Sequence, residues 1–153
     1  MATIQKEINI KNKKAEFEYF LTQRYEAGLV LVGTEIKAIR EGKANLVDAY
    51  CRFKKDELWV FNMHIGKFSK GTHYNHDPFQ VRKILLQKRE LKKLHSKVRE
   101  KGNTIIPTRL FISERGLAKL EIALAHGKRQ YDKRKTIKEK DVKRDMDRNY
   151  KFG

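Results

Sequence analysis

The stretch that decides the fold runs from Asp48 to Ile65 and has the sequence DAYCRFKKDELWVFNMHI. Its two halves, 48–53 and 58–65, are rich in aromatic and branched apolar residues, and the polar run KKDE at 54–57 separates them. Two such runs around a short polar turn predict an antiparallel β-hairpin. Cys51 is the only cysteine, which excludes an intrachain disulfide. On the first predicted strand it shares a face with Ala49, and we expect it to be a small buried core residue.

A second hairpin is predicted farther along the chain, where 108–113 and 117–125 flank the turn Glu114-Arg115-Gly116. Two more strands are expected. In 15–19, apolar Ala, Phe and Tyr alternate with glutamate, and in Leu29–Val32 a short apolar run lies between two glycines. Several short strands with interleaved aromatics predict a mainly β fold, a small antiparallel barrel with flanking helices rather than a βαβ fold.

The segment after the predicted strand at 29–32 has the pattern of a short helix. Thr34 is the expected N-cap, Ile36 and Ile39 point inward, and Gly42 follows the last turn. Both prolines, Pro78 and Pro107, are expected in connections, where a missing N–H does no harm. Trp59, between Leu58 and Val60, is expected to pack in the core.

The chain is strongly basic. The 153 residues carry a formal net charge of +17 with a sequence pI near 10.0, and the net charge is +7 within 82–101 and +6 within 127–153. Charge of one sign in such excess indicates a polyanionic partner. No apolar run approaches the roughly 20 residues of a membrane span, so a nucleic acid is favoured over a membrane. Residues 1–6 lack the apolar core of a signal peptide, which predicts a cytoplasmic protein.

The first basic segment has the pattern of an amphipathic helix. Leu91, Leu94 and Val98 recur at helical spacing, and Gly102 is a natural stop. An ordinary core-packing helix with a solvated face explains the apolar stripe. The excess of lysine and arginine around it exceeds what solubility requires and favours an outer surface that faces phosphates.

The second basic segment defines the predicted domain boundary. Residues 1–128 are expected to form one RNA-binding β-barrel domain with helices, and 129–153 a basic tail that is disordered when free. Within the tail, Val142, Met146 and Tyr150 recur at i, i+4 and i+8. So narrow an apolar stripe predicts a helix that forms only on a partner, although a merely solubilising tail is an alternative.

No catalytic constellation is found in the sequence. Gly28 to Gly33 is followed by Thr34, without the lysine of a phosphate-binding loop, and there is no Gly-x-Ser-x-Gly motif. The nearest approach to a metal cluster is His73, His76 and Asp77, a weak signal without cysteines or an HExxH pattern. We therefore expect a protein that is not an enzyme and needs no cofactor.

Successive blocks of the sequence resemble the SsrA-binding proteins, the small protein B family. The blocks lie in order over about residues 9–140: Asn12-Lys13-Lys14-Ala15, Tyr25-Glu26-Ala27-Gly28, Gly33-Thr34-Glu35, Gly42-Lys43-Ala44-Asn45-Leu46-x-Asp48-Ala49-Tyr50, Asn75-His76-Asp77-Pro78, Arg82-Lys83-Ile84-Leu85-Leu86 and Gly127-Lys128-Arg129-x-Tyr131-Asp132-Lys133-Arg134. The resemblance implies an oligonucleotide-binding-type (OB-like) β-barrel. It also implies an adaptor that binds the tRNA-like domain of tmRNA and delivers it, with elongation factor Tu, to stalled ribosomes for trans-translation. A monomer when free is expected.

The resemblance also implies two sets of contact residues. The RNA-binding set is Asn12, Lys13, Lys14, Glu26, Leu85, Lys119, Lys128 and Arg129. The set expected at the ribosomal decoding centre and mRNA channel is Tyr131, Asp132, Lys133 and Arg134, with Val142, Met146 and Tyr150 in the later tail. Asparagine and glutamate can hydrogen-bond unpaired nucleotides, leucine offers an apolar contact, and lysine and arginine neutralise phosphates.

Two alternatives from other classes remain at this point. A structural ribosomal protein would share the barrel and the charge. An RNA-processing enzyme would use a metal at His73, His76 and Asp77.

Overall fold

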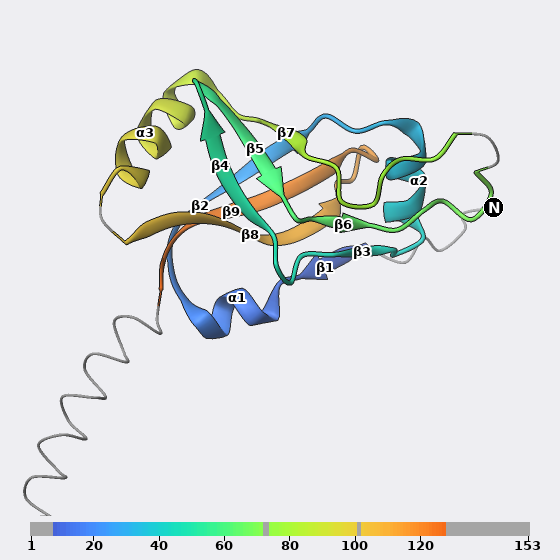
Figure 1. Ribbon diagram of the computed structural model, residues 1–153, viewed down its shortest axis with the longest axis horizontal. Coiled ribbons are helices and arrows are strands. Elements are labelled where there is room, and N and C mark those ends of the chain that lie inside the picture. The colour runs from blue at the N-terminus through green and yellow to red at the C-terminus, as the bar shows by residue number, and fades with distance from the viewer. Residues whose placement is uncertain (1–7, 72–73, 101, 128–153) are drawn as a thin grey trace, which may run out of the picture.

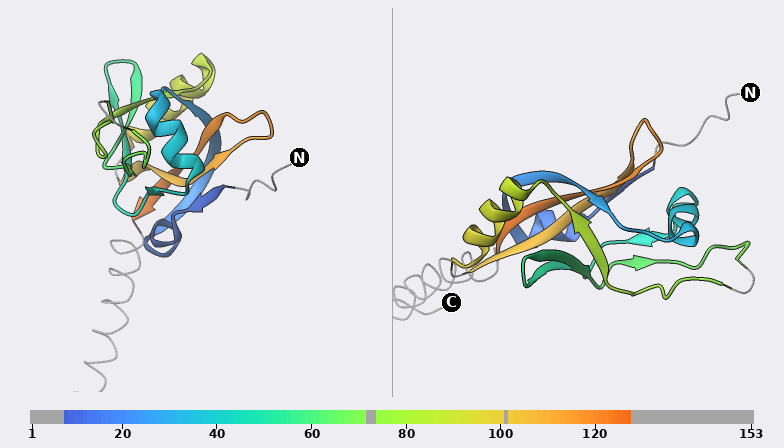
Figure 2. Two further views of the ribbon diagram at one scale, coloured as in Figure 1. Left: turned by 90° about the vertical axis from the view of Figure 1, so that its right-hand side faces the viewer. Right: turned by 90° about the horizontal axis from the view of Figure 1, so that it is seen from above.

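The computed structural model describes residues 8–71, 74–100 and 102–127. Its elements, in chain order, are β1 (Asn9–Lys11), α1 (Lys13–Glu18), β2 (Tyr19–Leu29), α2 (Gly33–Arg40), β3 (Ala44–Asn45), β4 (Tyr50–Lys54), β5 (Glu57–Phe61), β6 (His64–Ile65), β7 (Arg82–Leu85), α3 (Lys88–Val98), β8 (Asn103–Ile112) and β9 (Ala118–Gly127). The strands curl around a common centre, with the three helices outside them (Figures 1 and 2). In the described residues, no helix has the length and apolar character needed to cross a membrane.

Six strands close into a ring, which confirms the predicted antiparallel, OB-like barrel. The strand order is β8-β4-β5-β7-β2-β9, and a β8–β9 pairing closes it, while β1 adds to the free side of β8. Both predicted hairpins are present. Cys51 of β4 pairs with Val60 of β5, and Leu110 of β8 pairs with Leu120 of β9. Gly116 in the second turn has φ +80°, a backbone conformation that favours glycine.

The core lies inside the ring because alternate residues of each strand point inward. On β9, Leu120, Ile122 and Leu124 are buried inside the ring, whereas Glu121 between the first two is partly exposed. Leu94 of α3 is fully buried in the same cluster, so the predicted helix is confirmed and contributes to the core. Cys51 is buried as expected, and its burial raises the pKa of the thiol far above its usual value.

Two predicted strands are wrong. Residues 13–18 form α1 instead, with Ala15 buried and Phe17 82% exposed. Alternation over so few residues also suits a helix of one and a half turns, and the buried Asn12 cap decides between them. The strand predicted at 29–32 is absent: the strand there is β2, whose last residue is Leu29. Val30 and Val32 beyond it are about half exposed.

The helix predicted after residue 32 is present as α2, but its start differs. The N-cap is Val32 rather than Thr34, and the Glu35 carboxylate accepts a hydrogen bond from the Val32 N–H (Oε1–N 3.0 Å). The Thr34 hydroxyl instead forms a hydrogen bond with the Nδ1 of His76. Ile39 is buried, and Gly42 follows the helix with φ +77° as predicted.

A buried ion pair joins α2 to β7. Glu35 and Arg82 are each 1% exposed at the side chain, and the Arg82 Nε donates to the Glu35 Oε2. The Arg82 Nη1 also donates to the Met63 carbonyl at 2.5 Å, and its Nη2 to the Pro78 carbonyl at 3.2 Å. The mutual attraction of the two charges and the hydrogen bonds to both of them offset the desolvation penalty of burying the pair. It ties the backbone at Met63 and at Pro78 to the barrel.

Two smaller expectations are also wrong. Pro107 lies inside β8, next to a register shift between Pro107 and Arg109, where the strand tolerates a missing donor. Trp59 alternates with buried Leu58 and Val60 on β5, so its ring lies on the outer face and is partly exposed. The predicted boundary between domain and tail stays a prediction, because residues 128–153 lie outside the described residues.

Candidate RNA-binding surface

One outward-facing row of residues crosses the strands of the barrel side by side. Gly28 of β2 lies between Leu85 of β7 on one side and Lys119 of β9 on the other. Lys119 is in turn paired with Phe111 of β8. Asn9 of β1 ends the row opposite Phe111. Two predicted site residues that are 34 positions apart in sequence, 85 and 119, therefore share one face of the sheet with only a glycine between them.

Gly28 contributes no side chain to this row, and the space above it borders Leu85. A Cβ placed on it would be 3.4 Å from the Leu85 Cβ and 3.7 Å from its Cδ1. With no side chain there, Leu85 lies against the backbone of β2 and remains 47% exposed. The row thus presents an apolar side chain and a lysine on either side of the glycine.

The adjacent row carries the third predicted residue that the structure brings to this face. Glu26 of β2 lies opposite Glu121 of β9, which lies opposite Arg109 of β8, and Lys11 of β1 ends the row. The Glu26 side chain is 63% exposed, and its Oε1 is 3.7 Å from the Arg109 Nη2. We call the two rows, with Arg24, the outer sheet face.

Glu121 organises the charges of this face. Its Oε2 lies 3.0 Å from the Arg109 Nε, and its Oε1 lies 3.0 Å from the Arg24 Nη1. The Thr108 hydroxyl donates to the same Oε1 at 2.8 Å. Partial burial tends to raise the pKa of Glu121, but the hydrogen bonds from Thr108, Arg109 and Arg24 outweigh it and hold the pKa below its usual value.

Arg109 is therefore held by Glu121 rather than free to bind an anion. Its guanidinium also lies over the Phe111 ring, 4.1 Å from the ring centroid, which fixes the plane of both groups. With Arg109 occupied by Glu121, the more exposed Glu26 keeps lone pairs that can accept hydrogen bonds from a ligand. The outer sheet face combines an acceptor at Glu26, a cation at Lys119 and apolar surface at Leu85 and Phe111.

Asn12 is placed differently from these residues. It is 2% exposed, and its amide nitrogen donates to the carbonyls of Leu46 (3.0 Å) and Pro107 (2.9 Å). Its Oδ1 accepts from the Ala15 N–H at 3.1 Å and so caps α1. All of these groups are used within the protein, so the arrangement gives Asn12 a positioning role. It joins α1 to β8 beside the outer sheet face.

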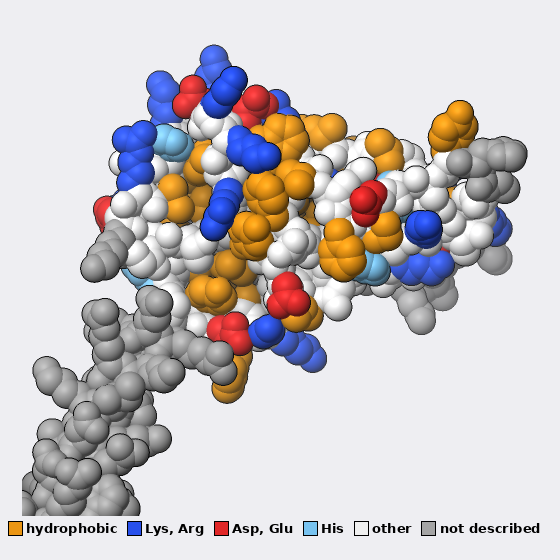
Figure 3. Space-filling view, in the orientation of Figure 1, with side chains coloured by type: hydrophobic (Ala, Val, Ile, Leu, Met, Phe, Trp, Pro, Cys, Tyr) orange, Lys and Arg blue, Asp and Glu red, His pale blue; other side chains and the backbone are white. Residues whose placement is uncertain are grey.

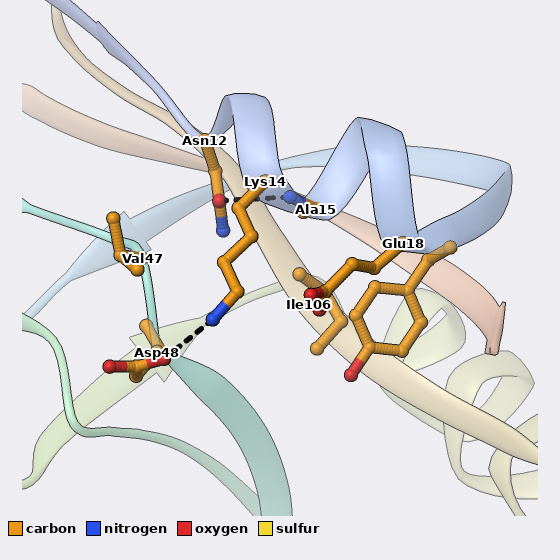
Figure 4. A pocket seen from close by; sticks show the side chains of 9 residues that line it. Asn12, Lys14, Ala15, Glu18, Val47, Asp48 and Ile106 are labelled. Atoms are coloured by element: carbon orange, nitrogen blue, oxygen red, sulfur yellow. Dashed lines mark hydrogen bonds and ion pairs between the residues drawn. The ribbon is translucent and has the colours of Figure 1, made fainter. Parts of the chain in front are cut away.

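The two lysines after Asn12 lie on the exposed side of α1. Lys13 is exposed, while the Lys14 ammonium lies 3.3 Å from an Asp48 carboxylate oxygen. Figure 4 shows Lys14 reaching from α1 toward Asp48 across a small pocket, with Ala15, Val47 and Ile106 around it. The pocket is about 130 Å³, which suits a few waters better than a nucleotide.

The remaining predicted site residues, Lys128, Arg129, Tyr131, Asp132, Lys133, Arg134, Val142, Met146 and Tyr150, lie outside the described residues. Their roles stay predictions. The last described residue, Gly127, pairs with Tyr19 at the start of β2.

The sequence reasoning missed Arg24, Arg109, Phe111 and Glu121. Each alternates with inward-facing residues in a strand, and this period-2 pattern was the available signal. The pattern places a residue on a face but does not give the register between strands. The network around Glu121 follows only from the observed pairing of β2, β8 and β9.

His76 has a structural role. Its Nδ1 is 2.9 Å from the Thr34 hydroxyl and its Nε2 is 2.8 Å from the Ile65 carbonyl oxygen, so Nε2 carries the proton and donates. Both ring nitrogens are thus engaged, which weakens the metal-site alternative. His73 lies outside the described residues. Within the described ranges, no three His, Cys, Asp or Glu side chains are grouped to hold a metal ion.

Comparisons with known proteins give a consistent result. The family model described as SmpB protein matches residues 9–152. The SsrA-binding protein of Cytophaga hutchinsonii is 60% identical over 145 residues, 95% of each chain. That of Bacillus cytotoxicus is 49% identical over 141 residues, covering 92% of this chain and 90% of the other. A chain of the solved structure described as "tmRNA-SmpB: a journey to the center of the bacterial ribosome" superposes with a TM-score of 0.68. It is 40% identical, covering 79% of this chain and 85% of that chain.

Proposed function

Because the chain belongs to the SmpB family, we propose that it binds tmRNA and brings it to stalled ribosomes as an adaptor in trans-translation. The observation that carries the proposal is the convergence of Glu26, Leu85 and Lys119 on the outer sheet face, from three segments far apart in sequence. These three residues are members of the RNA-binding set that the family resemblance implies. The relatives favour this adaptor over a structural ribosomal protein.

The outer sheet face has the chemistry that folded RNA requires. Unpaired nucleotides in loops offer hydrogen-bond donors on their base edges and ribose 2′-hydroxyls. The exposed Glu26 carboxylate can accept hydrogen bonds from these donors. The Lys119 ammonium neutralises a phosphate, and Leu85 with Phe111 covers a base or ribose. A carboxylate in an RNA site repels phosphates. It therefore favours an RNA that places a hydrogen-bond donor next to Glu26 and disfavours RNA that places a phosphate there.

The basic segment after the barrel serves the ribosome in this proposal. Lys128 and Arg129 extend the tmRNA contact, and Tyr131 to Arg134 act at the decoding centre. Val142, Met146 and Tyr150 then form the apolar stripe of a helix in the mRNA channel. The proposal for this segment rests on its sequence pattern and on the family resemblance.

The adaptor works by binding and needs no catalytic step or cofactor of its own. It acts in the cytoplasm, where ribosomes are, as a monomer that meets elongation factor Tu through the shared tmRNA. The two RNA partners in this proposal, tmRNA and ribosomal RNA, together account for the large excess of basic over acidic groups.

The test compares the affinity for the tRNA-like domain of tmRNA with that for a duplex RNA of the same length, over a range of salt concentrations. Generic phosphate binding weakens by roughly 0.7–0.9 log units per contact per tenfold salt, and it does so for both RNAs. The proposal predicts that preference for the tRNA-like domain persists at high salt. Equal affinities that fall together would contradict it and favour a general rRNA-binding protein, which should also resist high-salt washing from ribosomes.

A further inference from the structure

A groove of about 540 Å³ runs between α3 and the turn of the β4–β5 hairpin. Its apolar wall comprises Phe53 of β4 and Leu91 of α3, and the His95 ring meets Phe53 edge-on at a centroid distance of 4.8 Å. Lys88 and Lys92 of α3 line the same groove, together with Arg99, the residue that follows the helix. Aromatic and aliphatic surface thus lies directly beside three cations.

The cations of α3 are not neutralised within the described structure. None of the lysine or arginine side chains of Lys88–Val98 forms an ion pair with a carboxylate of the described residues. On the outer sheet face, by contrast, Glu121 holds both Arg24 and Arg109. Figure 3 shows Lys and Arg side chains crowded over α3, beside hydrophobic side chains over β4 and β5. Such unpaired charge is complementary to phosphate.

The groove lies away from the outer sheet face. In the closed ring β8-β4-β5-β7-β2-β9, β4 and β5 lie across the barrel from β2 and β9. An RNA loop held by Glu26 and Lys119 therefore leaves the wall at Phe53 open. The groove is a separate site, not an extension of the first one.

We infer that this groove binds one unpaired nucleotide of RNA, with its base against Phe53 and Leu91 and its flanking phosphates on Lys88, Lys92 and Arg99. RNA as the ligand class rests on the proposed function. The volume lies within the range of small-ligand sites, and base stacking on an aromatic ring is favourable for any base. A paired base in an A-form duplex cannot present its face to this wall, so the site selects single-stranded RNA. Asp56, at the hairpin turn, lines the groove as an acceptor for a base amino group.

The experiment measures binding of a fluorescent single-stranded RNA heptamer, a duplex of the same sequence and a glutamate peptide of equal charge. Lys92→Gln is compared with Lys93→Gln, because both lysines are exposed neighbours on α3 and only Lys92 lines the groove. We expect Lys92→Gln to weaken heptamer binding about five-fold and Lys93→Gln less than two-fold. Phe53→Leu, which keeps an apolar side chain but removes the ring, should cost about ten-fold.

Photo-crosslinking of wild-type protein with a heptamer that carries 4-thiouridine keeps the test independent of how well the variants fold. Crosslinks on 53–56 or 88–99 support the inference, and crosslinks confined to other segments overturn it. Equal losses for Lys92→Gln and Lys93→Gln, or equal binding of the peptide, overturn it as well. The proposed function is judged separately, by the preference of the wild-type protein for the tRNA-like domain. That preference can fail while the heptamer still depends on Lys92 and Phe53.

Discussion

Arg109 and Glu121 face each other across the β8–β9 pair with 3.0 Å between Nε and Oε2, and this contact sets the character of the outer sheet face. The Arg109 guanidinium is turned toward Glu121, so its Nη2 comes no closer than 3.7 Å to the Glu26 Oε1. The Glu26 side chain stays 63% exposed. A basic protein thus displays an accessible carboxylate in the middle of its candidate RNA site. That arrangement is useful for selection and unfavourable for general phosphate binding.

Replacing the carboxylate of Glu26 should weaken specific RNA binding. We expect Glu26→Ala to reduce affinity for the tRNA-like domain about ten-fold, because a hydrogen bond to a charged group is worth roughly 1.5–3 kcal/mol. Removing a negative charge would by itself strengthen RNA binding. Dissociation constants measured for both variants separate the two effects, with Glu114→Ala in the exposed β8–β9 turn as the control. Tighter binding of Glu26→Ala would defeat the proposed hydrogen bond.

The buried pair of Glu35 and Arg82 should contribute strongly to the stability of the fold. Arg82→Met leaves the Glu35 carboxylate buried without its partner, and we expect a loss of about 3–5 kcal/mol in the free energy of unfolding. Lys83→Met, which breaks the more exposed ion pair with Glu57, should cost less than about 1 kcal/mol. Urea unfolding of both variants measures the difference.

A double variant tests the cause of that loss. Glu35→Gln keeps an acceptor for the Val32 N–H but removes the charge, so combining it with Arg82→Met should recover part of the stability. No recovery would show that the carbonyl bonds of Arg82, rather than the unpaired carboxylate, account for the effect.

The low pKa of Glu121 predicts a stability that declines in acid. Since its pKa in the folded protein lies below the ordinary value of 4.5, the contribution is complete above that value and is lost as the pH falls through the lower, folded-state pKa. Melting temperatures from neutral pH to about pH 3 should fall more steeply for wild type than for Glu121→Gln. Parallel curves would mean that Thr108, Arg109 and Arg24 do not stabilise the charged form.

The basic tail should be separable from tmRNA binding. Truncation after Arg129 is expected to leave affinity for the tRNA-like domain within about two-fold, because the outer sheet face is intact, but to abolish rescue of stalled ribosomes. Binding and a reconstituted tagging reaction measure the two properties on the same protein. A large loss of affinity for isolated tmRNA would place essential contacts in the tail.

The sequence pattern predicted correctly those elements whose structure depends on neighbouring residues. Both hairpins, the helix around Leu94 and the burial of Cys51 follow from periodicity and turn residues. The helix at 13–18 could not be predicted, because its cap, Asn12, is held by carbonyls 34 and 95 positions away. Propensity and alternation carry no information about such distant partners.

The candidate site divides in the same way. Glu26, Leu85 and Lys119 were identified by resemblance, and the structure adds that they share one face. Arg109 and Phe111 were missed because strand register is a tertiary property, here set by a shift beside Pro107. Asn12 was identified by the same resemblance. Its burial shows that it positions α1, and its contact with RNA stays a prediction.

The central claim is that tmRNA binds the outer sheet face, and backbone amide NMR shifts during titration with the tRNA-like domain test it most directly. We predict the largest changes at Glu26 and Gly28 of β2, at Leu85 and at Lys119, with smaller changes in β4 and β5. Large changes confined to β4, β5 and α3, with β2 and β9 undisturbed, would contradict the account and place tmRNA on the opposite side of the barrel.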